Sequence, residues 1–265
     1  MVRVSVVIIT FNEQRNLARC LESIKDIADE IVVVDSYSTD NTIEIAERYG
    51  AKVIQHPFVG YGEQKNFATG HAINDWILSL DADEVLSAQL KTSILEVKDD
   101  PKLNVYQMHR LTNYCGKWIK YCGWYPDSQT RLYNRTKGKW EEKKVHEYWR
   151  PDDEADLKGT LKGDLLHYSF TSVSEHLKKI EKYSELGAEE AVQAGKEASL
   201  LKVMLYPKWR FFNDYVIQLG FLDGFYGFVI CRLSAYAAFI KYSKIRQHRR
   251  SEKSAATSTQ LNAGK

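Results

Sequence analysis

The stretch LSLDADE, residues 78–84, joins an apolar run to three carboxylates within four positions. Residues 76–78 and Leu80 are typical of a buried strand, and Asp81, Asp83 and Glu84 follow directly. Neighbouring carboxylates repel one another, and each disfavours ionisation of the next. We therefore expect a positively charged partner to lie against this group.

Strand and helix patterns alternate around this stretch. Apolar, β-branched runs predict strands, and apolar residues at helical spacing predict helices between them. The predicted strands cover residues 3–10, 30–36, 51–57 and 75–84, and the predicted helices cover residues 12–27, 40–50 and 61–72. This alternation predicts an α/β fold with a doubly wound, mostly parallel sheet. The first strand is not followed by a GxGxxG turn, which disfavours a dinucleotide site.

Composition narrows the class of protein. The chain has 265 residues, 44% of them hydrophobic, which allows one large α/β domain with an appendage or two small domains. Its net charge of +2 argues against a dedicated nucleic-acid binder. The chain opens directly into a short apolar run, which we interpret as a first strand rather than a signal peptide. We therefore expect a cytoplasmic protein whose four cysteines stay free.

The pattern changes after about residue 100. Residues 105–135 are rich in aromatic side chains and are broken by Gly and Pro, with one predicted strand at 128–134. A charged helix is predicted at about 173–199, and residues 211–240 are again rich in aromatic side chains. The polar tail, 251–265, has the composition of a disordered segment.

Polar side chains cluster where the first two predicted strands end. In a doubly wound sheet, ligands bind at the carboxyl ends of the strands. The first strand ends at Thr10, followed by Asn12 and Glu13, and the second ends at Asp35, followed by Ser38. A carboxylate such as Asp35 can accept hydrogen bonds from a base or a ribose. We therefore predict a nucleotide site at this edge.

The acidic stretch itself has the composition of a metal site. Carboxylate oxygens suit Mg²⁺ or Mn²⁺, and such sites often share the metal with substrate phosphates. Asp81 and Asp83 are the candidate ligands. The alternative is that both only cap the following helix, which begins near Ser87.

Together, three motifs resemble the inverting glycosyltransferases of family 2, which have the GT-A fold. They are TFNE (10–13), VVDSYSTDNT (33–42) and LSLDADE (78–84). The resemblance covers residues 1 to about 245. It implies a nucleotide-sugar donor, a divalent metal, Mg²⁺ or Mn²⁺, and a saccharide acceptor.

A narrower resemblance is to the heptose β-1,4-glucosyltransferases of the lipopolysaccharide core. It rests on four segments: GEQKNFA (62–68), GWYPDSQTRLYNR (123–135), KVHE (144–147) and the region of GFLDGFYG, SAY and KY (220–242). It implies transfer of glucose from UDP-glucose to a glycolipid. The alternatives are a non-catalytic sugar-nucleotide binding module and a sugar nucleotidyltransferase.

The resemblance also implies a division of the chain. A catalytic domain would span residues 1–170, with a nucleotide-sugar half at 1–100 and an acceptor half at 101–170. A helical extension, which could associate with a membrane, would span 171–250.

The resemblance also implies roles for single residues. Asp83 would be a direct metal ligand, and Asp81 would reach the ribose, or the metal through water. An inverting transfer needs a general base, for which Glu147 is the first candidate and Asp127 the second. His146 and His167 are secondary candidates for binding metal or diphosphate.

For several basic and aromatic side chains the sequence allows two roles, one in ligand binding and one in the structure. Lys65 could contact phosphate or be an ordinary exposed lysine, and Arg131 could contact phosphate or pair with an acid. Five aromatic residues could stack on sugars or pack in the core. They are Trp118, Trp124, Tyr125, Trp140 and Trp149.

The aromatic segment at 211–240 carries an apolar stripe at helical spacing, from Phe211 to Ile240. Three charged residues interrupt it, which argues against a transmembrane helix, and Gly220, Gly224 and Gly227 predict a break into two helices. The basic run KYSKIRQHRR (241–250) beside it suits an interfacial position on anionic lipid. We expect a peripheral protein on the cytoplasmic face of the inner membrane, the alternative being a helix pair packed on the catalytic domain or on a dimer partner.

Overall fold

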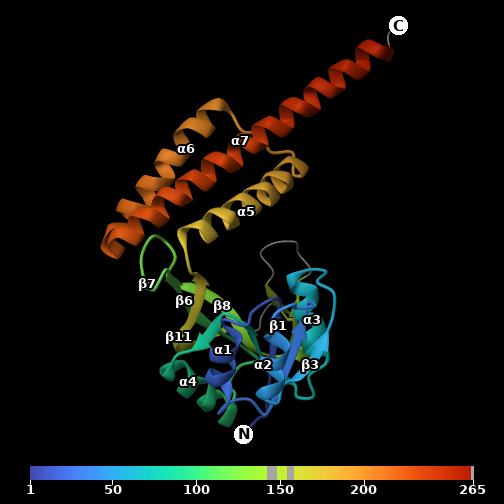
Figure 1. Ribbon diagram of the computed structural model, residues 1–265, viewed down its shortest axis with the longest axis vertical. Coiled ribbons are helices and arrows are strands. Elements are labelled where there is room, and N and C mark those ends of the chain that lie inside the picture. The colour runs from blue at the N-terminus through green and yellow to red at the C-terminus, as the bar shows by residue number, and fades with distance from the viewer. Residues whose placement is uncertain (142–147, 154–157, 264–265) are drawn as a thin grey trace. The chain divides into compact units, whose positions relative to one another are not determined.

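The computed structural model describes residues 1–141, 148–153 and 158–263. The chain divides into two compact units. The first unit comprises residues 1–112 and 126–169, and the second comprises 113–125 and 170–265. Segment 113–125, which the sequence analysis assigned to the acceptor half, therefore belongs to the helical unit. Figure 1 labels helices and strands of both units.

The first unit is built on a mixed sheet, one half of which is parallel. This half contains β1 (Val4–Thr10), β2 (Glu30–Asp35), β3 (Lys52–Gln55) and β4 (Trp76–Asp81). Its strands lie in the order β3-β2-β1-β4, and each neighbouring pair is parallel. Continuous β-branched runs are typical of strands that are covered on both faces, and this part of the fold confirms the prediction from the sequence.

The other half of the sheet is less regular. Strand β8 pairs antiparallel with β4 and with β6, and β11 pairs antiparallel with β5. The bounds are β5 (Glu84–Leu86), β6 (Val105–Tyr114), β8 (Asp127–Asn134) and β11 (Lys158–Phe170). A 3-10 turn, η1 (Arg135–Lys137), leads to a two-stranded sheet of β9 (Gly138–Trp140) and β10 (Trp149–Pro151). The single strand predicted at 75–84 is thus β4 and the start of β5, separated by a turn at Ala82–Asp83.

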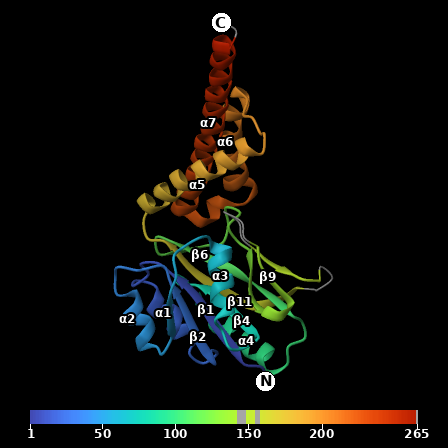
Figure 2. The ribbon, with the colours of Figure 1, turned by 90° about the vertical axis from the view of Figure 1, so that its right-hand side faces the viewer.

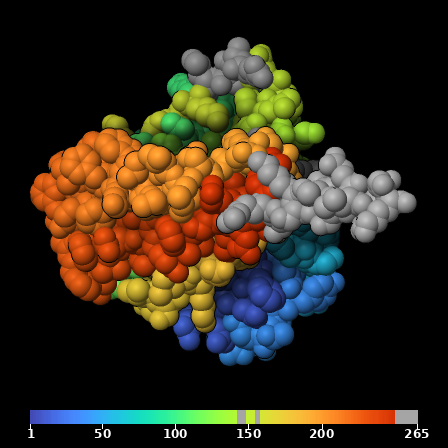
Figure 3. Space-filling model, turned by 90° about the horizontal axis from the view of Figure 1, so that it is seen from above, coloured from blue at the N-terminus to red at the C-terminus, as the bar shows by residue number. Residues whose placement is uncertain are grey.

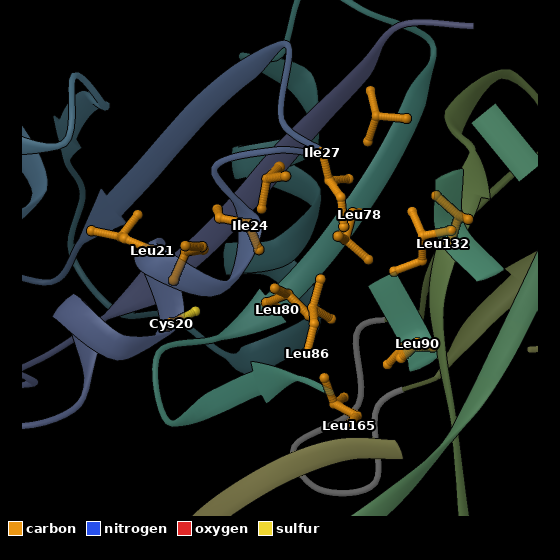
Figure 4. Packing of buried hydrophobic residues seen from close by; sticks show 14 of the residues in the cluster. Cys20, Leu21, Ile24, Ile27, Leu78, Leu80, Leu86, Leu90, Leu132 and Leu165 are labelled. Carbon is orange, nitrogen blue, oxygen red and sulfur yellow. The ribbon is translucent and has the colours of Figure 1, made fainter. Parts of the chain in front are cut away.

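Helices cover both faces of this sheet (Figure 2). On one face, α1 (Leu17–Ile24), α2 (Thr42–Arg48) and α4 (Ala88–Asp99) contribute to a single apolar core. Figure 4 shows Cys20, Leu21 and Ile24 of α1 packed toward Leu78 and Leu80 of β4. On the other face, α3 (Tyr61–Gly70) shares a core with β9 and β10.

Helix α1 is shorter than the predicted helix at 12–27. Asn12 has φ 56°, in the left-handed region, so the chain cannot continue as a helix from the end of β1. A turn follows, in which the amides of Asn16 and Leu17 donate to the carbonyl oxygen of Glu13. The predicted helix therefore begins only after this turn.

The second unit is helical. It contains β7 (Lys117–Ile119), α5 (Val173–Gln193), α6 (Leu200–Phe212), a π-helical turn η2 (Asn213–Ile217), a 3-10 turn η3 (Gly220–Asp223) and α7 (Gly224–Ala263). The side chains of Ser172 and Ser199 cap α5 and α6, each accepting a bond from a backbone amide. The composition predicted no regular structure after residue 250, and α7 extends through this segment to Ala263.

The predicted break in the aromatic segment is confirmed. Leu219 has φ 53°, which ends the helical run before η3. A Cβ atom on Gly227 would lie 2.0 Å from the carbonyl oxygen of Gly220, so glycine is required where α7 crosses η3. No single helix in the described part of the chain is long and apolar enough to cross a membrane. One pair, Leu200–Ile217 and Gly220–Arg249, reaches that composition and length together and is bent by 72° at its break.

Segment 113–125 is fixed to the helices by a buried acid. Asp223 Oδ2 accepts hydrogen bonds from the amides of Tyr121 (2.8 Å) and Lys120 (3.2 Å). Lys117 Nζ donates to the carbonyl oxygen of Asp223 at 2.5 Å. Cys122 packs with Cys231 of α7 in one buried cluster. Because Asp223, Cys122 and Cys231 are buried, this segment is anchored in the core of the second unit.

Candidate functional site

The ends of three parallel strands lie level with one another. In the register of the sheet, Thr10 of β1 is paired with Asp35 of β2, and Ile9 with Asp81 of β4. The polar residues that follow these strands are therefore brought to one edge of the sheet, as the sequence predicted. This edge is the candidate active site.

The loops after β1 and β2 are tied together through Asp35. This buried carboxylate accepts hydrogen bonds from Thr10 Oγ1 (2.9 Å), the Ser38 amide (2.7 Å) and Ser38 Oγ (2.5 Å). Asn12 Oδ1 accepts a bond from the amide of Thr39 at 2.8 Å. The predicted nucleotide-binding residues are thus neighbours, and Asp35 sets the shape of the two loops. Their contact with a nucleotide stays a prediction.

Glu13 and Gln64 extend this polar network. The Glu13 amide donates to Thr42 Oγ1 at 2.8 Å, which fixes the start of the first loop against α2. Gln64 of α3 is fully buried and donates to Ser36 Oγ at 3.1 Å. The role of Gln64 was missed by the sequence reasoning, although it lies within the quoted GEQKNFA segment. A glutamine between apolar helix positions was the available signal.

Lys65 and Arg131 both contact Asp81 of LSLDADE. Asp81 Oδ2 accepts a hydrogen bond from Arg131 Nη2 at 2.6 Å, and Asp81 Oδ1 lies 3.3 Å from Lys65 Nζ. Arg131 Nη2 also donates to Glu84 Oε1 at 2.7 Å. Glu84 is fully buried, Lys65 is 1% exposed and Arg131 is 2% exposed. The interpretation of Lys65 as an ordinary exposed lysine is therefore wrong, and the pairing of Arg131 with an acid is confirmed.

These charges determine the ionisation of Asp81. Burial opposes the charged form, but Arg131 and Lys65 outweigh it and hold the pKa of the Asp81 carboxyl well below its usual range. Cys20 lies beneath the cluster, and its thiol donates toward the Asp81 carbonyl oxygen at 3.8 Å. Burial, together with the charge of Glu84, raises the pKa of this thiol well above its ordinary value. Asp81 is thus a fixed anion, and Cys20 is an inert core residue.

Asp83 faces a histidine instead. Its Oδ2 lies 3.2 Å from Nε2 of His167 on β11. The pairing of β11 with β5, in which His167 is opposite Glu84, brings this imidazole to the acidic turn. On the other side of the ring, Nδ1 lies 3.4 Å from Thr112 Oγ1. The carboxylate of Asp83, in the turn after β4, and the imidazole of His167, on β11, therefore meet at this end of the sheet.

The alternative base candidate, Asp127, is also paired. Arg110 donates to Asp127 Oδ2 from Nε at 2.8 Å, and its Nη2 lies 2.6 Å from the same oxygen. Arg110 Nη1 lies 3.7 Å from Glu84 Oε1, which links this pair to the buried cluster. Glu147 and His146 lie outside the described residues, so their assignments stay predictions.

The donor set fits a metal that is shared with a substrate. Within the described ranges, no three His, Cys, Asp or Glu side chains gather into a complete metal site. Mg²⁺ and Mn²⁺ in phosphate-transfer sites commonly take only one or two protein ligands and complete their shell with phosphate and water. Asp83 and His167 supply an oxygen and a nitrogen at one point, whereas both oxygens of Asp81 already face cations.

The aromatic candidates divide between the two units. Trp140 and Trp149 are buried in the core of the first unit, where Trp149 stacks on Tyr133. For these two residues core packing is confirmed. Trp124 is partly buried in the second unit, in edge contact with Tyr114.

Comparison with known proteins agrees with this geometry. The family model described as glycosyl transferase family 2 matches residues 5–151, the part of the chain that carries all three strand-end motifs. The chain belongs to this family. Its sheet, with parallel β3-β2-β1-β4 and helices on both faces, is the GT-A fold that the resemblance implied.

Relatives within this family cover nearly the whole chain. An uncharacterized glycosyltransferase of Rickettsia felis is 35% identical over 264 residues, covering 93% of this chain and 90% of the relative. The lipopolysaccharide core biosynthesis glycosyltransferase LpsC of Rhizobium meliloti is 31% identical and covers 92% of both chains. Both units of the present chain therefore recur together in family 2 glycosyltransferases.

The similarity to solved structures covers a smaller part of this chain. Glucosyl-3-phosphoglycerate synthase from Mycobacterium tuberculosis, crystallised with Mn²⁺ and UDP-glucose, is 21% identical and covers 42% of this chain and 44% of its own, with a TM-score of 0.36. A likeness of this extent carries no argument about the substrate of the present chain.

Proposed function

We propose that this glycosyltransferase is an inverting, metal-dependent enzyme that transfers glucose from UDP-glucose to a glycolipid of the lipopolysaccharide core. The observation that carries the proposal is the meeting of Asp83 with His167, 3.2 Å apart, beside an Asp81 that Lys65 and Arg131 hold ionised. The similarity to LpsC over 92% of both chains supports the choice of acceptor.

In this proposal Asp83 and His167 would hold a divalent metal beside the donor diphosphate. A bound divalent metal supplies Lewis-acid stabilisation of the leaving diphosphate, an effect of roughly several kcal/mol. The ion pairs with Lys65 and Arg131 fix Asp81, so that its carboxylate can orient the ribose without moving. Thr10, Asn12, Glu13, Asp35 and Ser38 shape the loops that receive the nucleoside.

The transfer forms one bond as another breaks. The acceptor hydroxyl oxygen attacks C1 of the glucose while the bond from C1 to the diphosphate oxygen breaks, and UDP leaves with that electron pair. The hydroxyl proton passes to a carboxylate. Glu147 is the first choice for this base and Asp127 the second, because Asp127 already accepts two bonds from Arg110.

The site of action follows from the acceptor. We propose that the protein works at the cytoplasmic face of the inner membrane, where a nucleotide-sugar donor and a lipid-linked acceptor are both within reach. The exposed apolar side chains of the second unit support this location.

The metal assignment can be tested with the donor alone. We expect Asp83→Ala to lower UDP-glucose hydrolysis at saturating Mn²⁺ by about 10²–10³-fold, as loss of several kcal/mol implies. Asp99→Ala, which removes an exposed acid at the end of α4, is the matched control and should retain activity. Release of UDP and free glucose would distinguish a glycosyltransferase from a nucleotidyltransferase, and binding without turnover would indicate a binding module. Wild-type activity that survives EDTA would overturn metal dependence.

A further inference from the structure

Helix α6 presents an apolar face that the second unit does not cover. Leu201, Leu205, Trp209 and Phe212 recur every three or four residues and therefore lie on one side of the helix. Each is at least 47% exposed, and Leu201 reaches 68%. The opposite side of α6 places Val203 in a buried cluster with Ala198 and Ile245. The helix thus has one apolar side in the core and a second apolar side at the surface.

Exposed apolar side chains also occur at the break and in the first turn of α7. Leu222 of η3 is 51% exposed, and Phe225 in the first turn of α7 is 73% exposed. In Figures 1 and 2, α6 lies alongside the first half of α7, and Figure 3 shows α7 flanked by α6 and α5. We call the exposed apolar side chains of residues 200–228 the hairpin patch. Patches of this kind on a protein surface mark sites of interaction with another protein or with a membrane.

The charges beside the hairpin patch identify the kind of partner. Residues 200–240 contain two acids, Asp214 and Asp223, and both are buried. Lys202, Lys208 and Arg232 are exposed in the same segment. The charged side chains exposed along this segment are therefore all cationic, which complements the anionic headgroups of a bilayer.

The secondary structure of the hairpin also suits an apolar environment. A helix satisfies its backbone hydrogen bonds internally, so it can enter lipid without leaving amides unpaired. The two helical segments are long and apolar enough only when taken together, and they are bent by 72° at the break. This geometry suits insertion into the interface better than a straight span. Trp209 is of a residue type enriched at the boundary between lipid and water.

Three cations of the basic run at 241–250 make contacts within the second unit. Lys244 Nζ lies 2.8 Å from Glu181 and 2.7 Å from Glu185 of α5. Arg246 and Arg249 donate to the carbonyl oxygens of Ala198 (3.3 Å) and Val192 (3.2 Å). These three cations therefore attach α7 to α5 and to the segment that connects α5 with α6. The surface suited to a membrane therefore lies at the hairpin patch rather than at the basic run.

We propose that the hairpin patch inserts into one leaflet of an anionic lipid bilayer, with Lys202, Lys208 and Arg232 at the headgroups. The membrane location proposed above gives this insertion its biological setting. Vesicle binding requires neither donor nor acceptor, so a failure of the proposed transfer reaction and a failure of this inference can be told apart.

The experiment is co-sedimentation of the full chain with vesicles of phosphatidylcholine and phosphatidylglycerol. We expect Leu222→Ser combined with Phe225→Ser to lower the partition coefficient at least tenfold. The control combines Ile73→Ser and Leu95→Ser, which remove exposed apolar side chains from the first unit, and should stay within twofold of wild type.

Two double variants that remove cationic side chains test the proposed contact of Lys208 and Arg232 with lipid headgroups. Lys208→Gln combined with Arg232→Gln should lower binding to the anionic vesicles about tenfold. Lys178→Gln combined with Lys182→Gln removes two exposed charges from α5 and should change binding less than twofold. Equal losses from both charge variants would show that attraction depends on net charge alone and would overturn the assignment to the hairpin.

A spectroscopic measurement covers the case in which a variant fails to fold. Lipids brominated in their acyl chains should quench part of the wild-type tryptophan fluorescence, and this part should be absent in Trp209→Phe. Wild type that stays in the supernatant at low salt would overturn the inference. A stable lipid-free dimer in sedimentation velocity, disrupted by Leu222→Ser with Phe225→Ser and indifferent to vesicles, would assign the patch to a second copy of the chain instead.

Discussion

Glu84 and Arg131 are charged side chains that the first unit buries almost completely, whereas the second unit leaves Leu201 and Phe225 at its surface. Either choice costs stability when taken alone, since buried charge loses hydration and exposed apolar surface orders water. In the first unit the cost is offset by ion pairs at the ends of the strands. Among the described residues of the second unit nothing covers these apolar side chains, and in the proposal above a lipid bilayer does so. We interpret the buried charges of the first unit as part of the candidate active site, and the exposed apolar side chains of the second unit as a binding surface.

The largest effect that would sharpen this comparison concerns the base. We expect Glu147→Gln to lower turnover by about 10²–10⁴-fold with little change in metal-dependent UDP affinity, because glutamine is nearly isosteric but cannot accept the proton. Asp127→Asn should cost less, since Asp127 is already committed to Arg110. Steady-state kinetics with calorimetric UDP binding provide the measurement. The opposite ranking of the two variants would make Asp127 the base.

The next effect tests whether the buried charges of the first unit depend on one another. Arg131→Met should lower the free energy of unfolding by about 3–5 kcal/mol, because Asp81 and Glu84 would lose the cation between them. Arg150→Met is the matched control, since Arg150 is exposed and pairs with Glu141 at the surface, and should cost under about 1 kcal/mol. Urea unfolding measures both. Similar losses for the two variants would mean that the cluster does not depend on Arg131.

A pH experiment addresses the core of the second unit. Burial among aromatic rings lowers the pKa of His176 to about 4, and its Nδ1 lies 3.1 Å from Tyr114 Oη. Between pH 6.5 and 4 the unfolded chain binds a proton at this residue that the folded chain does not. The free energy of unfolding should therefore fall as the pH is lowered through this range, by ~2 kcal/mol at pH 5.

The variant His176→Asn isolates this contribution. Asparagine can keep a bond to Tyr114 but does not titrate, so the difference in unfolding free energy between wild type and variant should change with pH over this range. Urea unfolding at pH 7.5 and pH 5 is the measurement. A wild type and a variant with the same pH dependence would show that the pKa of His176 is not lowered in the folded chain.

The smallest effect is expected on the outside of the helical unit. Lys244→Met should lower the free energy of unfolding by at most about 1 kcal/mol, because its partners Glu181 and Glu185 are largely exposed. Lys178→Met, on the exposed side of α5, is the control and should be neutral. A loss of 3 kcal/mol or more would mean that charge pairing is as important to the second unit as to the first.

The sequence predicted those features that depend on neighbouring residues. Thr10, Asp35 and Asp81 could be placed at one edge because each follows an apolar strand, and strand ends in a parallel sheet meet. The break near Gly220 and Gly227 was predictable because both residues are glycines within an aromatic helix pattern. The need for a positive partner beside LSLDADE was also evident from its charge.

The features that the sequence did not predict depend on pairing between distant strands. Asp83 meets His167, and Arg110 meets Asp127, only through the register of β5 with β11 and of β6 with β8. The pattern of apolar and polar residues within one strand does not determine its register with a strand that is distant in the sequence. The pairing of Lys244 with Glu181 and Glu185 of α5 could not be predicted for the same reason, since it arises only after the helices pack.

Segment 113–125 belongs to the helical unit although the residues on either side belong to the first unit, so the chain passes between the units at three places in the sequence. The helical unit is consequently formed by two separate segments of the sequence, not by one contiguous C-terminal segment. A chimaera joined near residue 170 would separate Asp223 from the loop whose amides, those of Lys120 and Tyr121, donate to it. To exchange the whole second unit between two relatives, both residues 113–125 and residues 170–265 should therefore be replaced together.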